Sequence, residues 1–228
     1  MVDRHRYRVW FSKTDVLRWI SHRDLLRLWE RLLRRQEIGL SMTEGFHPKP
    51  RMHFPSALAL GVPGRREVLE IDVTRWYEPS QLKATLEADR QPGLAVLLVE
   101  HVPLGLPKAQ LASASYRMTL PPEILAQVLP WLSETRWRDA LIDRPPASSI
   151  DESEAEPAPI PDRTAVLGDH VSYLECSHGE LRFGLRAVGG KTLKPEVVAA
   201  ALGISAEHWP SIAGTLCREA IEVEPPLT

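Results

Sequence analysis

The chain has 228 residues, enough for one large domain or two small ones, and a chain of this length buries about 70% of its unfolded surface. Hydrophobic residues make up 43% and charged residues 25%, which is ordinary for a globular protein and excludes a wholly disordered chain. No apolar run approaches the roughly 20 residues of a membrane helix, and no signal peptide opens the sequence. We therefore expect a soluble, cytoplasmic protein.

The net charge of −2 hides an asymmetry along the chain. Residues 1–66 contain 14 Lys and Arg against 6 Asp and Glu, a net charge of +8, whereas the remaining residues carry −10. A basic segment next to an acidic one often marks a surface that faces a polyanion. The alternative is that these arginines only keep the surface soluble.

The first half of the chain predicts the element order β-α-β-β-α-β, which is typical of a ferredoxin-like fold. Ser21, with Asp24 three residues later, is a helix-capping signal, and the apolar spacing that follows predicts an amphipathic helix ending at Gly39. The other predicted elements are the strands 7–11, 41–43, 52–60, 68–73 and 94–102, the turn 61–64 and the helix 78–90.

The second half repeats this order more loosely. Its predicted elements are the strands 116–120, 170–176, 181–187 and 217–223 and the helices 123–132 and 195–202. Residues 143–162 are acidic and rich in proline, so we expect a mobile loop there. The sequence thus predicts an α+β fold of two ferredoxin-like modules packed together, residues 1–110 and 111–228, with the acidic loop in the second.

Two features of the basic segment indicate phosphate binding. The first helix carries arginines at near-helical spacing, which gives it an arginine face beside its apolar face. The loop after it has cations between prolines, which hold the backbone extended, and Arg and Lys are suited to binding phosphate. We predict that RNA contacts Arg23, Arg27, Arg31, Arg34, His47, Lys49 and Arg51. The alternative is that the prolines merely order the loop.

A catalytic alternative uses the histidines of the same segment. His22 stands at the first position of the predicted helix, where the helix dipole lowers the pKa of an imidazole. In a metal-independent endoribonuclease, His22 would be the general base, His47 the general acid, and Arg51 would stabilise the charged phosphate. The competing interpretation is that His22 only holds the neighbouring loop against the helix.

Metal and cofactor motifs are not found in the sequence. Cys176 and Cys217 lie far apart, without the CxxC spacing of a zinc site. His47 and His53 have no carboxylate or cysteine at ligand spacing. The sequence also lacks the CxxxCxxC triplet of a radical SAM enzyme, whose cluster needs several thiolates. We therefore predict no metal and no cofactor.

Several short motifs resemble one bacterial family. They are Phe11-Ser12-Lys13, Ile20-Ser21-His22, Glu44-Gly45-Phe46-His47-Pro48, Leu60-Gly61-Val62 and Lys194-Pro195-Glu196-Val197. Together they resemble the radical SAM-linked protein family, a bacterial domain found beside or fused to radical SAM proteins, over nearly the whole chain. The resemblance implies a radical SAM partner and a role in translation or RNA metabolism.

The residues and the resemblance together predict an accessory RNA-binding module that works with a radical SAM protein. The endoribonuclease is one alternative, and the first module is also similar to the ferredoxin-like endoribonucleases that process CRISPR repeats. The other alternative is a protein–protein adaptor whose basic face meets an acidic partner.

Overall fold

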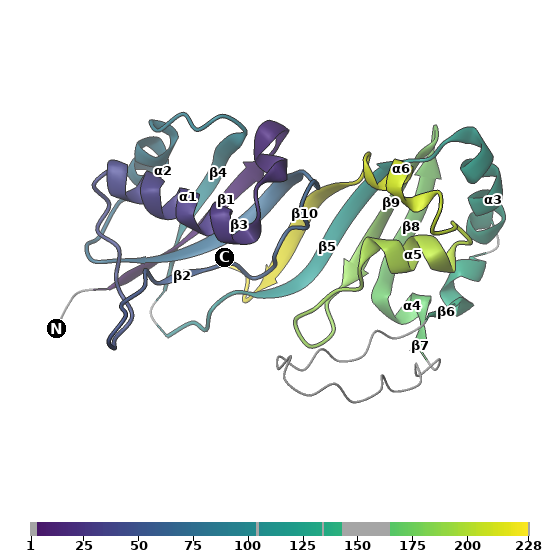
Figure 1. The fold of residues 1–228 in the computed structure, drawn as a ribbon. Coiled ribbons are helices and arrows are strands. Elements are labelled where there is room, and N and C mark those ends of the chain that lie inside the picture. Colours follow the sequence, from purple (N-terminus) through teal and green to yellow (C-terminus); the bar gives the residue numbers. More distant parts are fainter. Residues whose placement is uncertain (1–3, 104, 134, 143–164, 228) are drawn as a thin grey trace.

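The computed structural model describes residues 4–103, 105–133, 135–142 and 165–227. These residues form a mixed α+β fold in which one sheet runs through both halves of the chain (Figure 1). The predicted α+β class is therefore confirmed. The acidic segment 143–162 lies outside the described residues, so the mobile loop expected there stays a prediction.

The structure contains the following strands and helices, named in chain order. The strands are β1 (His5–Lys13), β2 (Met52–His53), β3 (Gly64–Val73), β4 (Leu94–Val102), β5 (Gln110–Thr119), β6 (Leu141–Ile142), β7 (Ala165–Val166), β8 (Val171–Ser177), β9 (Glu180–Arg186) and β10 (Cys217–Glu224). The helices are η1 (Asp15–Trp19), α1 (His22–Arg35), α2 (Pro79–Glu87), α3 (Pro122–Ser133), η2 (Arg136–Asp139), α4 (Leu167–His170), α5 (Pro195–Ala201) and α6 (Trp209–Ala213), where η marks a 3-10 helix. Within the described residues, no helix is long and apolar enough to cross a membrane.

The last strand of the chain joins the two halves. The main sheet has the order β4-β1-β3-β10-β5-β9-β8, and β2 pairs with a separate part of β3. β10 meets β3 in parallel, with Arg218 opposite Gly64, and runs antiparallel to β5 on its other side. We call the line along β10, between β3 and β5, the seam. β6 and β7 form a small sheet of their own.

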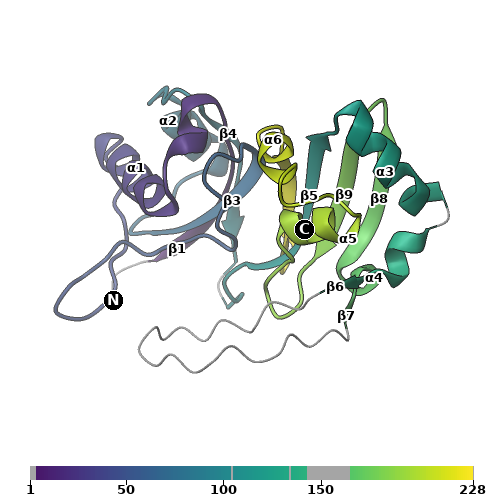
Figure 2. The ribbon, with the colours of Figure 1, turned by 45° about the vertical axis from the view of Figure 1, so that its right-hand side comes forward.

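Helices from both halves cover the same face of the main sheet (Figures 1 and 2). In the first half, Tyr7, Val9 and Phe11 alternate along β1 and are buried against α1 and α2, whereas Arg8 and Trp10 are buried on the opposite face, so both faces of this strand are covered. The ring of Phe11 meets Trp29 of α1 edge-to-face, with the centroids 5.2 Å apart. In the second half, α3 lies against β8, and α5 and α6 belong to the same core, which contains the stacked rings of Tyr116 and Phe183.

The first helix begins as predicted and ends earlier. The amide of Asp24 donates to the Ser21 hydroxyl at 3.1 Å, so Ser21 is the N-cap. The helix ends at Arg35, because Glu37 takes a left-handed backbone conformation (φ +54°) that closes the last turn. Gly39 is therefore not the stop signal; it lies so close to Thr74 that a Cβ would be 2.5 Å from its hydroxyl.

The strand predicted over 52–60 is wrong beyond His53. Only Met52–His53 pairs with β3, and Pro55, which has no amide hydrogen, interrupts the strand. The Ser56 hydroxyl and the Ala57 carbonyl accept hydrogen bonds from Arg218 of β10 instead of from a neighbouring strand. These residues therefore connect the first half to the seam.

Other differences are local. The predicted turn 61–64 is shorter, because Gly64 is already the first residue of β3. The short strand expected at 41–43 is reduced to isolated bridges of Leu40 with Val73 and of Met42 with Pro50. β5 begins at Gln110, well before the predicted start at Tyr116, and α6 had no counterpart among the predicted elements. The predicted strand 94–102 coincides with β4.

Candidate nucleic-acid interface

The loop between α1 and β2 is an ordered hairpin, which we call the basic hairpin (residues 41–51). The amide of Thr43 donates to the Lys49 carbonyl at 2.8 Å, and the amide of Lys49 donates to the Thr43 hydroxyl at 2.9 Å. At its base, the amide of Arg51 donates to the Ser41 carbonyl at 2.8 Å. Gly45 takes a positive φ of 121° at the turn, which favours glycine there. The expected ordered loop is thus held by its own backbone.

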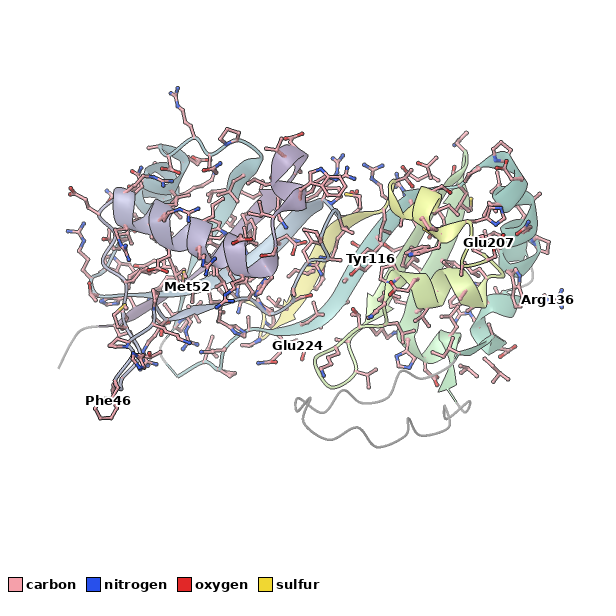
Figure 3. All side chains as sticks on the ribbon, viewed as in Figure 1. Phe46, Met52, Tyr116, Arg136, Glu207 and Glu224 are labelled. Carbon is pink, nitrogen blue, oxygen red and sulfur yellow. The ribbon has the colours of Figure 1, made fainter. Side chains whose placement is uncertain are left out.

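The tip of the basic hairpin presents an aromatic ring to solvent. Phe46 is fully exposed, at 102% of its reference area, and Figure 3 shows it pointing away from the sheet. His47 and Lys49 on the same hairpin are also exposed. Among the described residues, neither side chain has a hydrogen-bond or ion-pair partner. Single exposed apolar side chains are common on protein surfaces; what distinguishes Phe46 is its position beside His47 and Lys49 on an ordered hairpin.

The side chain of Arg51, in contrast, has a hydrogen-bond partner. Its Nε donates to the Met42 carbonyl at 2.9 Å, across the base of the basic hairpin. His53, which follows in β2, places Nε2 2.8 Å from the Ala109 carbonyl. Arg51 therefore fixes the base of the hairpin and His53 links β2 to the residue before β5, while the tip itself carries His47, Lys49 and the acid Glu44.

The arginine face of α1 is exposed, as its spacing predicted, but its members differ. Arg27 pairs with Asp24 at 3.4 Å, and Arg34 pairs with Glu30 at 2.8 Å. Within the described chain, Arg23 and Arg31 are exposed and have no carboxylate partner. These two guanidinium groups can bind a phosphate without first breaking an ion pair with a carboxylate.

Part of the positive charge of residues 1–66 is internal. Arg8 is buried in the sheet and pairs with Glu70 at 3.1 Å. Lys13 is buried as well; its ammonium donates to the Ile20 carbonyl at 2.9 Å, and burial lowers its pKa. The net charge of +8 therefore overstates the charge that this segment shows to a partner.

His22 lies at the start of α1, half-buried against Phe54, with the ring centroids 5.1 Å apart. Its pKa is lowered, as predicted, but the main cause is burial, followed by the nearby charge of Lys13. This packing holds the 54–57 segment against the helix, which was the structural alternative for this residue.

The two histidines of the endoribonuclease alternative lie apart. His22 is at the end of α1 nearest the seam, whereas the basic hairpin that carries His47 hangs below the other end (Figure 1). A general base and a general acid must both reach the scissile phosphate. Arg51 is also engaged at the hairpin base, so this arrangement lends no support to the nuclease alternative.

Metal ligands do not gather in the part of the chain that the structure describes: no group of three or more His, Cys, Asp or Glu side chains could hold an ion there. Sequence reasoning included Lys49 and His47 as contacts but left out Phe46. Its signal was an aromatic residue between Gly45 and His47-Pro48, in a loop with no apolar neighbour to pack on.

Residues 6–149, more than half of the chain, match a protein family described as uncharacterised proteins conserved in bacteria (DUF2344). No curated protein matches the chain.

Proposed function

The chain belongs to this family of uncharacterised bacterial proteins, and we propose that it is an accessory RNA-binding module that works with a radical SAM protein. The observation that carries the RNA-binding part is the tip of the basic hairpin. It presents the exposed ring of Phe46 next to the exposed His47 and Lys49 on a backbone fixed by its own hydrogen bonds.

An exposed ring beside an imidazole and an ammonium group suits single-stranded RNA. Unpaired bases stack on aromatic side chains, and each stacked base contributes about 1–3 kcal/mol. Lys49 and His47 are positioned to meet the phosphates that flank such a base. Because the hairpin is already ordered, little conformational entropy is lost when RNA binds.

The arginines of α1 extend this surface. Arg23 and Arg31 are exposed and unpaired within the described residues, so they supply electrostatic attraction along the outer face of the helix. We place Arg27 and Arg34 on the same surface with smaller contributions, because Asp24 and Glu30 already neutralise them.

We also propose that each half of the chain is a ferredoxin-like module. The strand order supports this: the first half runs β4-β1-β3-β2 and the second half β10-β5-β9-β8. In both halves the fourth strand lies beside the first and the second beside the third. The helices between them follow the βαββαβ order of that fold.

The radical SAM partner rests on the family resemblance of the sequence motifs. Purification of the tagged chain from its native cells, with and without ribonuclease treatment, tests it by mass spectrometry of the bound proteins. A radical SAM protein that stays bound after ribonuclease treatment is the expected result. Its absence under both conditions would remove the partner from the proposal.

RNA binding is tested at the tip of the basic hairpin, by fluorescence anisotropy with single-stranded RNA at several salt concentrations. We expect Phe46→Ala to weaken binding on the order of tenfold, which is the loss of one stacked base. Phe46→Ala/Lys49→Ala should also flatten the salt dependence. Leu141→Ala is the matched control, because it removes a strongly exposed apolar side chain from the second half.

Two results would contradict the proposal. One is the failure of the wild-type chain to bind any RNA at low salt. The other is equal RNA affinity of Phe46→Ala and Leu141→Ala. If the Phe46 variant instead loses a protein partner while RNA binding is unchanged, the hairpin belongs to a protein–protein adaptor.

A further inference from the structure

A groove of about 450 Å³ opens where η1 meets the end of the seam. We call it the seam groove. Its walls come from four separate parts of the chain: η1, the first residues of β3, Arg117 of β5, and the turn that leads into β10. The side chains that matter for the argument are Arg18, Trp19, Arg65, Arg117 and Asp15. The groove exists only because β10 brings the two halves together.

The lining of the seam groove has an excess of positive charge. Three guanidinium groups face one lining carboxylate, that of Asp15. Glu219, beside the groove, serves two arginines, with 3.4 Å to Arg65 Nε and 2.5 Å to Arg117 Nε. Arg117 is further neutralised by Glu180 at 3.0 Å, so Arg65 has only a share of one carboxylate.

Arg18 is the unsatisfied member of this set. Its Nε is buried and has no hydrogen-bond partner within the described residues. The residue as a whole is half-buried, and its guanidinium forms no ion pair with a carboxylate of the described residues, so its charge can pair with a carboxylate or phosphate oxygen. Arg18 and Arg65 together therefore favour an anion in the groove.

A flat platform lies beside this anion position. The guanidinium carbon of Arg18 is 4.6 Å from the centroid of the Trp19 ring, which is 63% exposed. The ring rests against Gly61, whose φ is +81°; a Cβ there would come within 2.9 Å of it. Gly61 also donates its amide to the Arg18 carbonyl at 2.8 Å, so this loop fixes the platform. Unpaired bases stack on aromatic rings and on guanidinium planes alike.

We propose that the seam groove binds one nucleotide of single-stranded RNA, with its phosphate at Arg18 and Arg65 and its base on the Arg18–Trp19 platform. This inference rests on the proposed RNA-binding function and adds a second contact site to it. η1, which lines the groove, precedes the first residue of α1, whereas the basic hairpin lies below the other end of this helix (Figure 1). α1 has 14 residues and is thus about 21 Å long, so only an RNA of several nucleotides reaches both sites. On the way it passes Arg31 and Arg23.

The test compares groove variants with hairpin variants, using oligouridylates of increasing length. We expect Arg18→Gln/Arg65→Gln to weaken binding of the longer oligomers at least fivefold and to lower the salt slope by about 0.7 for a lost phosphate contact. Arg18→Lys keeps the charge but loses the planar group, so it should keep the salt slope and still lose affinity. Lys191→Gln is the control, because it removes an exposed cation that does not line the groove.

Photo-crosslinking with 4-thiouridine RNA supplies a second readout. We expect crosslinks to peptides that contain Trp19 as well as to peptides that contain Phe46.

The groove proposal is overturned if the groove variants bind like Lys191→Gln and no crosslink maps to residues 15–19. If hairpin variants still lose binding in that case, the proposed function stands without the groove. If the groove variants lose binding and the hairpin variants do not, the groove stands and the hairpin assignment falls. If the wild-type chain binds no oligomer, both fall.

Discussion

The outer face of α1 and the interior of the sheet both contain arginines, but these arginines have different roles in the two regions. Arg23 and Arg31 on the helix are exposed and unpaired within the described chain. Arg8 and Arg218 in the sheet are buried, at 1% and 2% exposure, and each forms an ion pair with a buried glutamate. A guanidinium group in water is available to a phosphate, whereas a buried one is committed to the fold.

The difference shows how to interpret a basic segment. Arg6, Arg8 and Arg35 already have partners in Asp72, Glu70 and Asp89, so much of the charge of the first 66 residues is neutralised locally. Exposed cations without a full carboxylate partner among the described residues lie on the outer face of α1, at the tip of the basic hairpin, in the seam groove and at Arg66, which stacks on Trp10. We expect a change at a buried arginine pair to lower the stability of the fold and a change at an exposed arginine to lower RNA affinity.

The largest effect, on the stability of the fold, is expected at the buried ion pair of the seam, Arg218–Glu67. Glu67→Gln leaves the Arg218 guanidinium buried without its carboxylate, so we expect a loss of about 3–5 kcal/mol in the free energy of unfolding, measured in urea. Arg34→Ala, which breaks an exposed pair, should leave the unfolding midpoint unchanged.

A second variant keeps this prediction testable if Glu67→Gln does not fold. Glu67→Leu/Arg218→Met removes both charges and should recover part of the loss. An unfolding free energy of Glu67→Gln within about 1 kcal/mol of the wild type would show that the pair does not hold the seam.

A smaller effect, on binding and not on stability, is expected on α1. Arg23→Ala/Arg31→Ala should weaken RNA binding and lower the salt slope by about 0.7 for each lost contact, with no change in the urea midpoint. Arg27→Ala/Arg34→Ala removes the same charge from the paired arginines and should have the weaker effect, because those side chains must leave Asp24 and Glu30. Equal losses in both double variants would mean that the ion pairs do not matter to binding.

The smallest effect concerns pH. Burial and the charge of Lys13 lower the pKa of His22, and burial and His5 lower the pKa of His101. The unfolded chain therefore takes up protons first, so stability is complete above the ordinary histidine pKa of about 6.5 and declines as the pH falls below it.

We expect His22→Gln/His101→Gln to reduce this decline, measured by urea unfolding between about pH 7 and about pH 5.5, above the range in which carboxylates titrate. His178→Gln, in an exposed turn, is the control. A pH dependence identical to that of the wild type would show that these two histidines are not its source.

The parts of the fold that depend on local spacing could be predicted from the sequence. The Ser21 cap and the apolar stripe of α1 lie within a few residues of each other, and the strongly apolar segment 94–102 forms β4. The pairing of β10 with β3 could not be predicted, because it depends on contacts between residues more than a hundred positions apart. The strand predicted over 52–60 is interrupted at Pro55, and another distant contact places the residues that follow, because Ser56 and Ala57 accept hydrogen bonds from Arg218.

The sequence predicted where the basic residues of the candidate site lie, but not which of their side chains have partners in the fold. Helical spacing was enough to identify an arginine face on α1, but whether an arginine has a partner depends on which acids the fold brings near. Arg51 and His53 looked available in the sequence and are tied to Met42 and Ala109 in the structure. Arg18 and Trp19 gave no signal, because their groove is completed by residues 214–217.

The central position of β10 also sets the order in which the molecule is completed during synthesis. Residues 217–224 leave the ribosome after every other strand of the sheet, yet they lie in its middle. The Arg218–Glu67 contact spans 151 residues, and such distant pairings form slowly. The first half has its own core and can form as soon as β4 is available. The seam groove is different: a chain synthesised only as far as β9 carries the basic hairpin but not the groove, which residues 214–217 complete.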